Sequence, residues 1–175
     1  MIARLSTRTA FLLGLCLILG CSPVPRKYLR EAAPNVTLES LTASPDTYRN
    51  RLVIMGAVIV EEEMREGALW LHVKNRPLDQ DYRPQLPPSP DDPEAGPYWI
   101  LVGNPRSFPG TRHHWADMTI VGRVVGLASG NEPVLKMVYV RGWALESTYA
   151  AVWEDSIDPN YIPSSLTGVL GEVGQ

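Results

Sequence analysis

Cys21 is the residue whose type and position most clearly point to chemistry, because its thiol directly follows the small Gly20. An apolar run that begins at Ala10 ends there, and two arginines precede that run. A basic start, a short apolar core and a small residue before a cleavage point are the parts of a secretory signal peptide. The run is too short for a permanent membrane span, which needs about 20 apolar residues. Residues 1–20 are therefore predicted to be a signal peptide.

The residues Ile18-Leu19-Gly20-Cys21 resemble the bacterial lipobox. In proteins with this motif, the cysteine thiol takes a diacylglycerol and the chain is cut just before it. Cys16 is a poor substitute, since bulky Leu15 precedes it; an ordinary signal peptide cut at Gly20 or shortly after is the alternative. Each buried CH2 of an acyl chain contributes about 0.8 kcal/mol to membrane binding. Lipid on Cys21 would therefore make the membrane a partner of this chain.

The histidines and serines predict neither a metal site nor a catalytic site. His113 and His114 are neighbours, so in a strand their side chains would point to opposite faces. His72 stands alone, and no cysteine other than Cys21 remains after residue 20 to complete a zinc ligand set. No serine lies in a Gly-x-Ser-x-Gly setting. We expect no catalytic residue, no metal, no cofactor and no enzymatic activity.

Apolar runs separated by turn residues predict five strands, at 52–60, 69–74, 98–102, 118–125 and 134–143. Gly56 and Gly122 lie in mid-strand and predict the bends or bulges that closing a small barrel requires. A short helix is predicted from Pro45 to Tyr48, with Ser44 as its N-cap. The predicted fold class is all-β: a small antiparallel OB-like barrel of about five strands, with a short N-terminal helix and an irregular C-terminal tail.

The predicted domain organisation divides the chain after the signal peptide into three parts. Residues 21–35 are polar and punctuated by prolines, so we expect a lipidated tether. Residues 36–145 are expected to form the β-barrel domain. Residues 146–175 have little potential to form a core and are expected to be a partly disordered tail.

Charge and aromatic content bear on the kind of partner. Loss of residues 1–20 takes the formal charge from −3 to −5, and this acidic balance argues against nucleic acid. Glu61 to Glu63 are interpreted as a solvated strand end. Five tryptophans are expected to cover the barrel wall or to pack the tail: Trp70, Trp99, Trp115, Trp143 and Trp153. If they instead form an exposed aromatic face, a glycan or a peptide is the expected ligand.

The segment from Arg76 to Asp79 is a candidate structural or partner-binding loop. Pro77 lacks an N–H and is expected to end the second strand. Arg76 and Asp79 are close enough in sequence to form an ion pair across a turn. Leu78, between them, would then hold the following proline-rich loop against the barrel. We favour this structural role over partner binding, although polar loop residues also serve recognition.

Five sequence blocks, in this order, resemble the Slp family of outer-membrane lipoproteins: Pro45–Tyr48, Met55–Glu61, Leu69–Val73, Arg76–Asp79 and Thr119–Gly126. The resemblance implies lipid anchoring at the outer membrane and a structural or stress-related role in the envelope, with no established catalysis and an envelope protein as a candidate partner. Ser22, in place of an Asp, favours export to that membrane, and we expect the periplasmic leaflet. The alternative, from a different functional class, is an OB-like periplasmic module that binds a glycan, a peptide or a small ligand.

Overall fold

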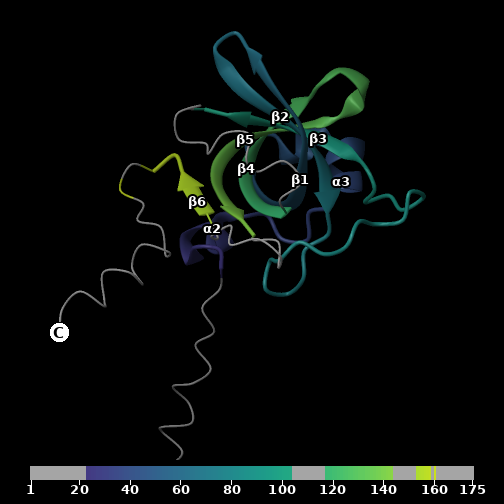
Figure 1. The fold of residues 1–175 in the computed structure, drawn as a ribbon. Coiled ribbons are helices and arrows are strands. Elements are labelled where there is room, and N and C mark those ends of the chain that lie inside the picture. Colours follow the sequence, from purple (N-terminus) through teal and green to yellow (C-terminus); the bar gives the residue numbers. More distant parts are fainter. Residues whose placement is uncertain (1–22, 104–116, 144–152, 159, 161–175) are drawn as a thin grey trace, which may run out of the picture.

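The computed structural model describes residues 23–103, 117–143, 153–158 and 160, and it places them in a β-barrel with short helices outside it (Figure 1). The helices are α2 (Arg26–Glu31), α3 (Leu38–Ala43), α4 (Pro45–Tyr48) and the 3-10 turn η3 (Ser129–Asn131). The strands are β1 (Leu52–Arg65), β2 (Ala68–Arg76), β3 (Pro97–Val102), β4 (Asp117–Leu127), β5 (Pro133–Gly142) and β6 (Trp153–Ser156). None of the helices in these ranges is long and apolar enough to span a bilayer.

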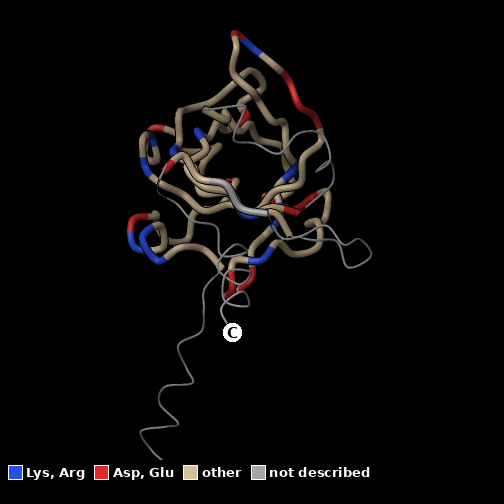
Figure 2. The backbone as a smooth tube through the Cα atoms, turned by 60° about the vertical axis from the view of Figure 1, so that its left-hand side comes forward, with Lys and Arg blue, Asp and Glu red and all other residues tan. Residues whose placement is uncertain are grey.

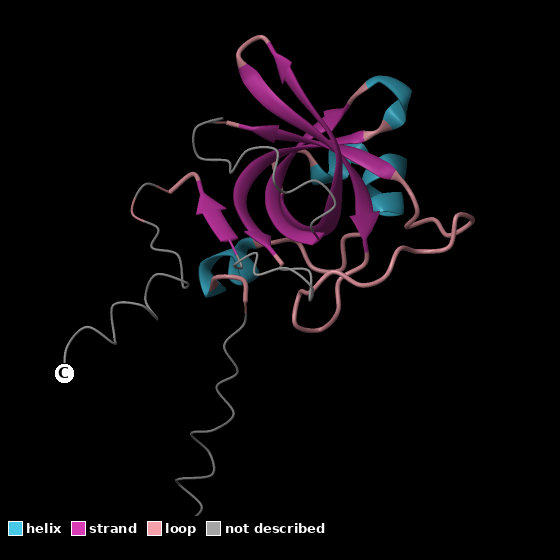
Figure 3. Cartoon of the chain, viewed as in Figure 1, coloured by secondary structure: helices cyan, strands magenta, loops and turns pink. Residues whose placement is uncertain are grey.

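Strands β1 to β5 curl into a closed barrel (Figure 3). Neighbouring strands follow the order β3-β2-β1-β4-β5-β6, and β3 also pairs with β5. This closing pair is parallel, with Trp99 opposite Val134 and Leu101 opposite Lys136, whereas the other pairs are antiparallel. An odd number of strands cannot alternate in direction around a ring, so one pair has to be parallel. The predicted all-β, OB-like barrel of about five strands is confirmed, and the parallel pair is the departure from a fully antiparallel sheet.

Strand β5 divides one of its edges between two partners. Its residues 134–136 pair with β3, and its residues 139–142 pair with β6. β6 lies in the region predicted to be an irregular tail. The prediction is wrong for residues 153–156, which form a strand paired with β5.

The barrel interior is filled by apolar side chains from all five strands. Alternate residues of β1 belong to one buried cluster, namely Val53, Met55, Ala57 and Ile59. Leu38 and Leu41 of α3 join the same cluster, so this helix covers one part of the barrel. The interior is therefore a packed core, and a ligand would have to bind on the outer surface.

Two of the helices that precede β1, α3 and α4, begin at residues whose types favour a helix start. α3 begins after Thr37, whose hydroxyl accepts a hydrogen bond from the Ser40 N–H at 3.1 Å in a capping box. α4 has Pro45 at its first position, as predicted, but the Ser44 side chain makes no capping hydrogen bond. Among the described residues, three short α-helices precede the barrel, where one short N-terminal helix was predicted.

Strand β1 is longer than predicted and continues through Glu61 to Glu63. Its register against β2 shifts between Ile59 and Glu61, so the bulge is located there and not at Gly56. A Cβ atom on Gly56 would lie 2.1 Å from the carbonyl oxygen of Arg76, so glycine is required there for close approach of two backbones. The three glutamates lie within a hairpin that projects from the barrel, and do not end the strand.

Residues 23–35 pack against the barrel, which differs from the free tether that proline content predicts. Val24 is fully buried and Tyr28 is 5% exposed, and both contact a second apolar cluster. This cluster lies on the outside of the barrel and includes Leu52 of β1, Val121 of β4 and Tyr139 of β5. Two apolar side chains four residues apart are enough to hold this short segment, because they meet a matching apolar patch.

Candidate functional site

Three aromatic side chains form one face on the outside of strands β2 and β3. Trp70 and His72 occupy alternate positions of β2, and Trp99 lies on β3 directly opposite His72. Their neighbours along the two strands, including Leu71 and Tyr98, are fully buried in the core. Because successive side chains of a strand point to opposite faces, the alternation that fills the core also places these three rings together outside. We call Trp70, His72 and Trp99 the aromatic face.

The rings of the aromatic face are in direct contact. The imidazole of His72 stacks on the indole of Trp99, with 4.4 Å between centroids and 19° between planes. Trp70 meets Trp99 edge to face at 6.3 Å. The guanidinium of Arg65, from the tip of the hairpin, lies 4.2 Å from the Trp99 ring centroid and 5.4 Å from that of Trp70. All three rings remain partly exposed, so they form a surface that a planar or apolar ligand can cover.

Charged side chains border the aromatic face on two sides. On the hairpin side, Arg65 and Glu63 form an ion pair of 2.5 Å, and the hydrogen bond from Arg65 lowers the pKa of the Glu63 carboxyl. On the other side, His72 Nε2 lies 3.2 Å from a carboxylate oxygen of Glu132, which follows η3. The border carries both signs of charge, as expected for a site that binds a neutral or zwitterionic ligand and unlike a site for nucleic acid.

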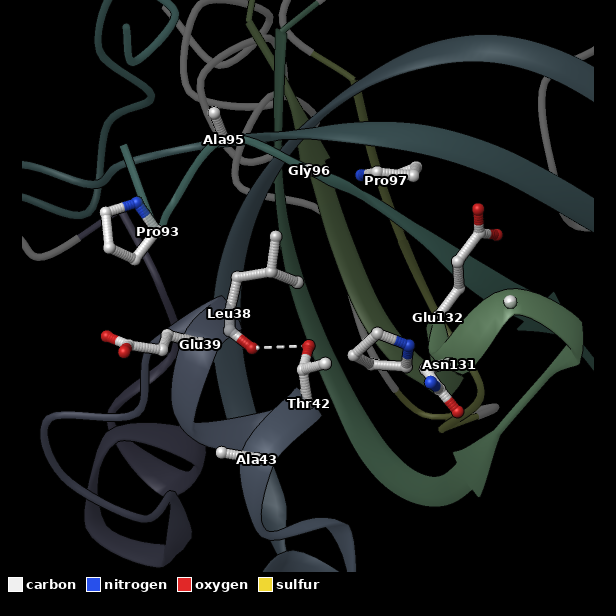
Figure 4. A pocket seen from close by; sticks show the side chains of 12 residues that line it. Leu38, Glu39, Thr42, Ala43, Pro93, Ala95, Gly96, Pro97, Asn131 and Glu132 are labelled. Atoms are coloured by element: carbon white, nitrogen blue, oxygen red, sulfur yellow. Dashed lines mark hydrogen bonds between the residues drawn. The ribbon is translucent and has the colours of Figure 1, made fainter. Parts of the chain in front are cut away.

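Hollows lie on both sides of the aromatic face. One, of about 390 Å³, is lined by Arg65, Glu66, Ala68, Trp70 and Leu101. A second, of about 460 Å³, lies between α3 and η3, and Figure 4 shows Glu132 across it from Leu38 and Glu39. Glu132 therefore both contacts His72 and lines this second hollow. The hollows extend the surface that an elongated ligand could occupy beyond the rings themselves.

This arrangement is suited to stacking and hydrogen bonding. Indole rings provide planes for sugar rings, bases or apolar side chains, and OB-type barrels use this face and the adjoining loops for oligosaccharides and oligonucleotides. Glu63, Arg65 and Glu132 can exchange hydrogen bonds with hydroxyl or amide groups. Within the described residues, no three His, Cys, Asp or Glu side chains gather as metal ligands. The rings and the charged border thus provide stacking surfaces and hydrogen-bonding groups for a ligand.

The segment from Arg76 to Asp79 is structured differently from the prediction. Arg76 pairs with Asp117 of β4, with 3.5 Å between Nε and Oδ1, and not with Asp79. Partial burial raises the pKa of the Asp117 carboxyl above its usual range, although the Arg76 charge opposes that shift. The predicted ion pair between Arg76 and Asp79 is wrong, because Asp117 at the start of β4, two strands away in the sheet, is available to the guanidinium.

Asp79 instead organises the loop that follows it. One of its carboxylate oxygens accepts hydrogen bonds from the backbone N–H groups of Asp81 and Arg83, both at 2.8 Å. Its other oxygen accepts one from the Gln85 side chain at 3.3 Å. A carboxylate that accepts local backbone N–H groups fixes a turn. Asp79 therefore has a structural role, through a different set of bonds from those predicted.

Pro77 and Leu78 behave as the sequence predicts. β2 ends at Arg76, directly before Pro77. The side chain of Leu78 lies over Gly56 of β1, where an added Cβ would come within 2.8 Å of Leu78 Cδ2. Leu78 thus contacts the outer wall of the barrel at the start of the loop from residue 77 to residue 96, which we call the 77–96 loop.

The other end of the 77–96 loop is held by Glu94. Its carboxylate accepts hydrogen bonds from the backbone N–H of Leu38 at 3.0 Å and from the Asn75 side chain at 3.1 Å. Glu94 thus joins the start of α3 to β2. Of the two roles considered for Arg76–Asp79, these contacts support the structural one. Nothing in the described part of the chain tests the partner-binding role.

Sequence reasoning identified some residues of the aromatic face but gave them another role. Trp70 and His72 alternate with apolar residues, and that alternation correctly predicts that they share the face opposite the buried row. Trp143 agrees with the packing interpretation, since its indole N–H donates to the Thr119 hydroxyl at 2.9 Å. No sequence pattern predicts the contacts of Arg65 and Glu132. Those contacts depend on how the end of β1 and the turn after η3 lie over the sheet. Several residues weighed above lie outside the described residues: Gly20, Cys21, His113, His114 and Trp115.

Comparison with known proteins gives one family. The family model described as "Outer membrane lipoprotein Slp family" matches residues 18–165, which is most of the chain and includes the residues around Cys21. No curated protein and no solved structure matches the chain.

Proposed function

The chain belongs to the Slp family of outer-membrane lipoproteins, and on that basis we propose that it is a non-catalytic envelope protein with a structural or stress-related role. Lipid on Cys21 would hold it in the periplasmic leaflet of the outer membrane. The observation that carries the proposal is the position of Cys21: it follows Gly20 at the end of the apolar run, inside the family match. The filled barrel interior supports a role that depends on the outer surface of the domain.

The anchor is tested by replacing its cysteine. The full chain carrying Cys21→Ala should leave the membrane fraction, and it should lose the palmitate analogue that the wild-type chain incorporates. Cys16→Ala is the matched control, because it removes the other cysteine and should keep both the label and the membrane fraction. A wild-type chain without lipid on Cys21 would overturn the proposal.

A second candidate function rests on the aromatic face. Trp70, His72 and Trp99 lie together on the strands and beside the loops that OB-type barrels use for binding. We infer from this position a lipid-anchored module that binds a glycan, a peptide or a small ligand. The acidic balance of the chain and the mixed charges at the border favour a glycan or a peptide over nucleic acid.

Binding at the aromatic face is tested with two tryptophan variants. Trp99→Ala should weaken retention on insoluble cell-wall glycan, or reduce a crosslink to an envelope protein in intact envelopes. Trp143→Ala is the control, because its indole packs against β4 instead. Circular dichroism must show that both variants keep the fold. If Trp99→Ala and wild type behave alike in both assays, the aromatic face is a packing feature and the structural role stands alone.

A further inference from the structure

The residue predicted to carry lipid is separated by only two peptide links from a point fixed on the barrel. The carbonyl oxygen of Pro23 accepts hydrogen bonds from the Tyr139 hydroxyl and from Arg141 Nη1, both at 3.3 Å. Val24, the next residue, is fully buried. Two residues of extended chain span about 7 Å at most. An acylated Cys21 would therefore hold this part of the barrel directly at the bilayer surface, with no tether between them.

Helix α2, which follows this point, presents two arginines away from the barrel. Tyr28 is buried, and Arg26 and Arg30 each lie two residues from it, which places them on the opposite side of the helix. Both are exposed, and neither forms an ion pair or hydrogen bond through its side chain with the described residues. They are one turn apart and form a single cationic strip.

The neighbouring charges of α2 are paired, so they do not cancel that strip. Lys27 binds Asp158 with 2.6 Å between Nζ and Oδ2. Glu31 binds Arg123 with 2.5 Å between its oxygen and the guanidinium. Beside Asp158, Ile157 is an exposed apolar side chain, with 53% of its surface accessible. Arg26 and Arg30, which have no ion-pair partner among the described residues, match the phosphates of a phospholipid surface. The exposed Ile157, on the segment that Lys27 of α2 binds, matches its upper acyl region.

The hairpin of β1 and β2 lies at the other end of the molecule. In Figure 1 it projects upward, while α2 lies at the bottom, and Figure 2 shows the same separation after the view is turned. The charged tip of the hairpin and the basic coil of α2 are both visible in Figure 2. A bilayer against α2 would therefore leave the hairpin, and the Arg65 that borders the aromatic face, pointing away from it.

We propose that α2 is a membrane-contact surface: the lipidated barrel lies on the phospholipid bilayer through Arg26, Arg30 and Ile157, in one fixed orientation. This inference rests on the proposed lipidation of Cys21. The short distance from the lipid keeps the helix at the surface, and the two arginines bind headgroup phosphates. Each arginine near an anionic surface strengthens binding about fivefold. The orientation directs the hairpin away from the membrane and toward the periplasmic space.

The orientation is tested with fluorophores on introduced cysteines in the full, lipidated chain. Ile157→Cys places a label beside α2, and Met64→Cys places one on the hairpin, at a side chain that is 59% exposed. Cys16 is removed with the signal peptide, and the thiol of Cys21 is lipidated. The introduced cysteine is then the thiol that reacts with the fluorophore, so each label reports one position. The proteins are reconstituted in phosphatidylethanolamine and phosphatidylglycerol vesicles that contain a nitroxide-headgroup lipid. Quenching should be strong at position 157 and weak at position 64.

Two variants identify the cause of that difference. In R26Q/R30Q, quenching at position 157 should fall toward the value at position 64, while the chain stays in the vesicle fraction. A flexible Gly-Ser insertion between Ser22 and Pro23 should have the same effect, since it lengthens the connection without changing α2. Equal quenching at both positions in the wild-type background, with lipid present on Cys21, would overturn the orientation. Absence of lipid on Cys21 in the same sample would instead overturn the proposed function.

Discussion

The hydroxyl of Tyr98 on β3 donates a hydrogen bond to the carbonyl oxygen of Gly56 on β1, 3.0 Å away, across strands that are not neighbours. Tyr98 is fully buried, and burial raises the pKa of its phenol, so the group remains a donor. The other side of Gly56 is covered by Arg76 and Leu78. The backbone of Gly56 is therefore contacted by Tyr98 from the barrel interior and by Leu78, at the start of the 77–96 loop, from outside.

Tyr98→Phe should lower the free energy of unfolding by about 1–3 kcal/mol, because it leaves the buried Gly56 carbonyl without its donor. Urea unfolding followed by circular dichroism measures the change. Tyr82→Phe is the control, since no hydrogen bond joins the Tyr82 hydroxyl to another described residue. Equal loss in both variants would mean that the Tyr98 hydroxyl contributes nothing specific.

Gly56→Ala should be severely destabilising, at the upper end of about 1–3 kcal/mol or beyond, because the new methyl group would overlap the Arg76 carbonyl. The strand would have to separate from the end of β2 to accommodate it. Gly103→Ala is the matched change, since no atom of the residues that the structure describes lies within 4 Å of a Cβ at that position. Melting temperatures of the two variants should differ clearly, and similar values would show that β1 and β2 are farther apart than described.

Asp79→Ala should loosen the 77–96 loop and lower stability by about 1–3 kcal/mol, because two backbone N–H groups lose their acceptor. Limited proteolysis should cut that loop faster than in the wild-type chain. Asp81→Ala removes the same charge from the same loop and leaves those bonds in place. Should Asp79→Ala digest like wild type yet lose an envelope partner that crosslinks to the wild-type chain, the segment is a binding site and not a structural one.

Asp117→Asn should change how stability depends on pH. Burial raises the pKa of Asp117 in the folded chain, so the fold binds that proton more tightly than the unfolded chain does. The contribution of Asp117 is therefore greatest below its unfolded pKa, near 4, and declines as the pH rises through the folded pKa. The melting temperature of the variant, relative to wild type, should rise between about pH 3 and pH 7.

Asp158→Asn is the comparison with the opposite sign. The hydrogen bond from Lys27 lowers the pKa of Asp158, so its contribution is present above the unfolded pKa and is lost as the pH falls. The melting temperature of this variant, relative to wild type, should fall over the same rise in pH. Parallel profiles for the two variants would contradict the assigned shifts.

Patterns within single segments were enough to predict the barrel. Apolar alternation located all five of its strands, since each places a buried row toward one core. Contacts between distant segments could not be predicted in the same way. Val24 and Tyr28 are two apolar residues in a polar stretch, so nothing local shows that they meet Leu52 and Tyr139. β6 could not be predicted from its own residues either, because it is defined by its pairing with β5.

In the candidate site, too, patterns within one strand could be predicted from the sequence, whereas contacts between distant segments could not. The shared face of Trp70 and His72 follows from strand periodicity, and their contact with Trp99 follows once β2 and β3 are paired. Glu132 reaches His72 from a loop 60 residues away in sequence, and Arg76 finds Asp117 on another strand. Charged side chains are long and have many rotamers, so sequence proximity alone selected the wrong partner for Arg76.

The parallel pairing of β3 with β5 also determines when the barrel can close during synthesis. Until residues 134–136 have emerged, one edge of β3 and one edge of β4 have no partner strand. Open edges are templates for pairing with other chains. A chain that stopped before Pro133 would therefore keep both edges and would be prone to aggregate, whereas a chain that reached Gly142 would have covered them. Closure depends on β5, the last of the five barrel strands, so any factor that protects this protein before it folds has to act until residues 133–142 have been made.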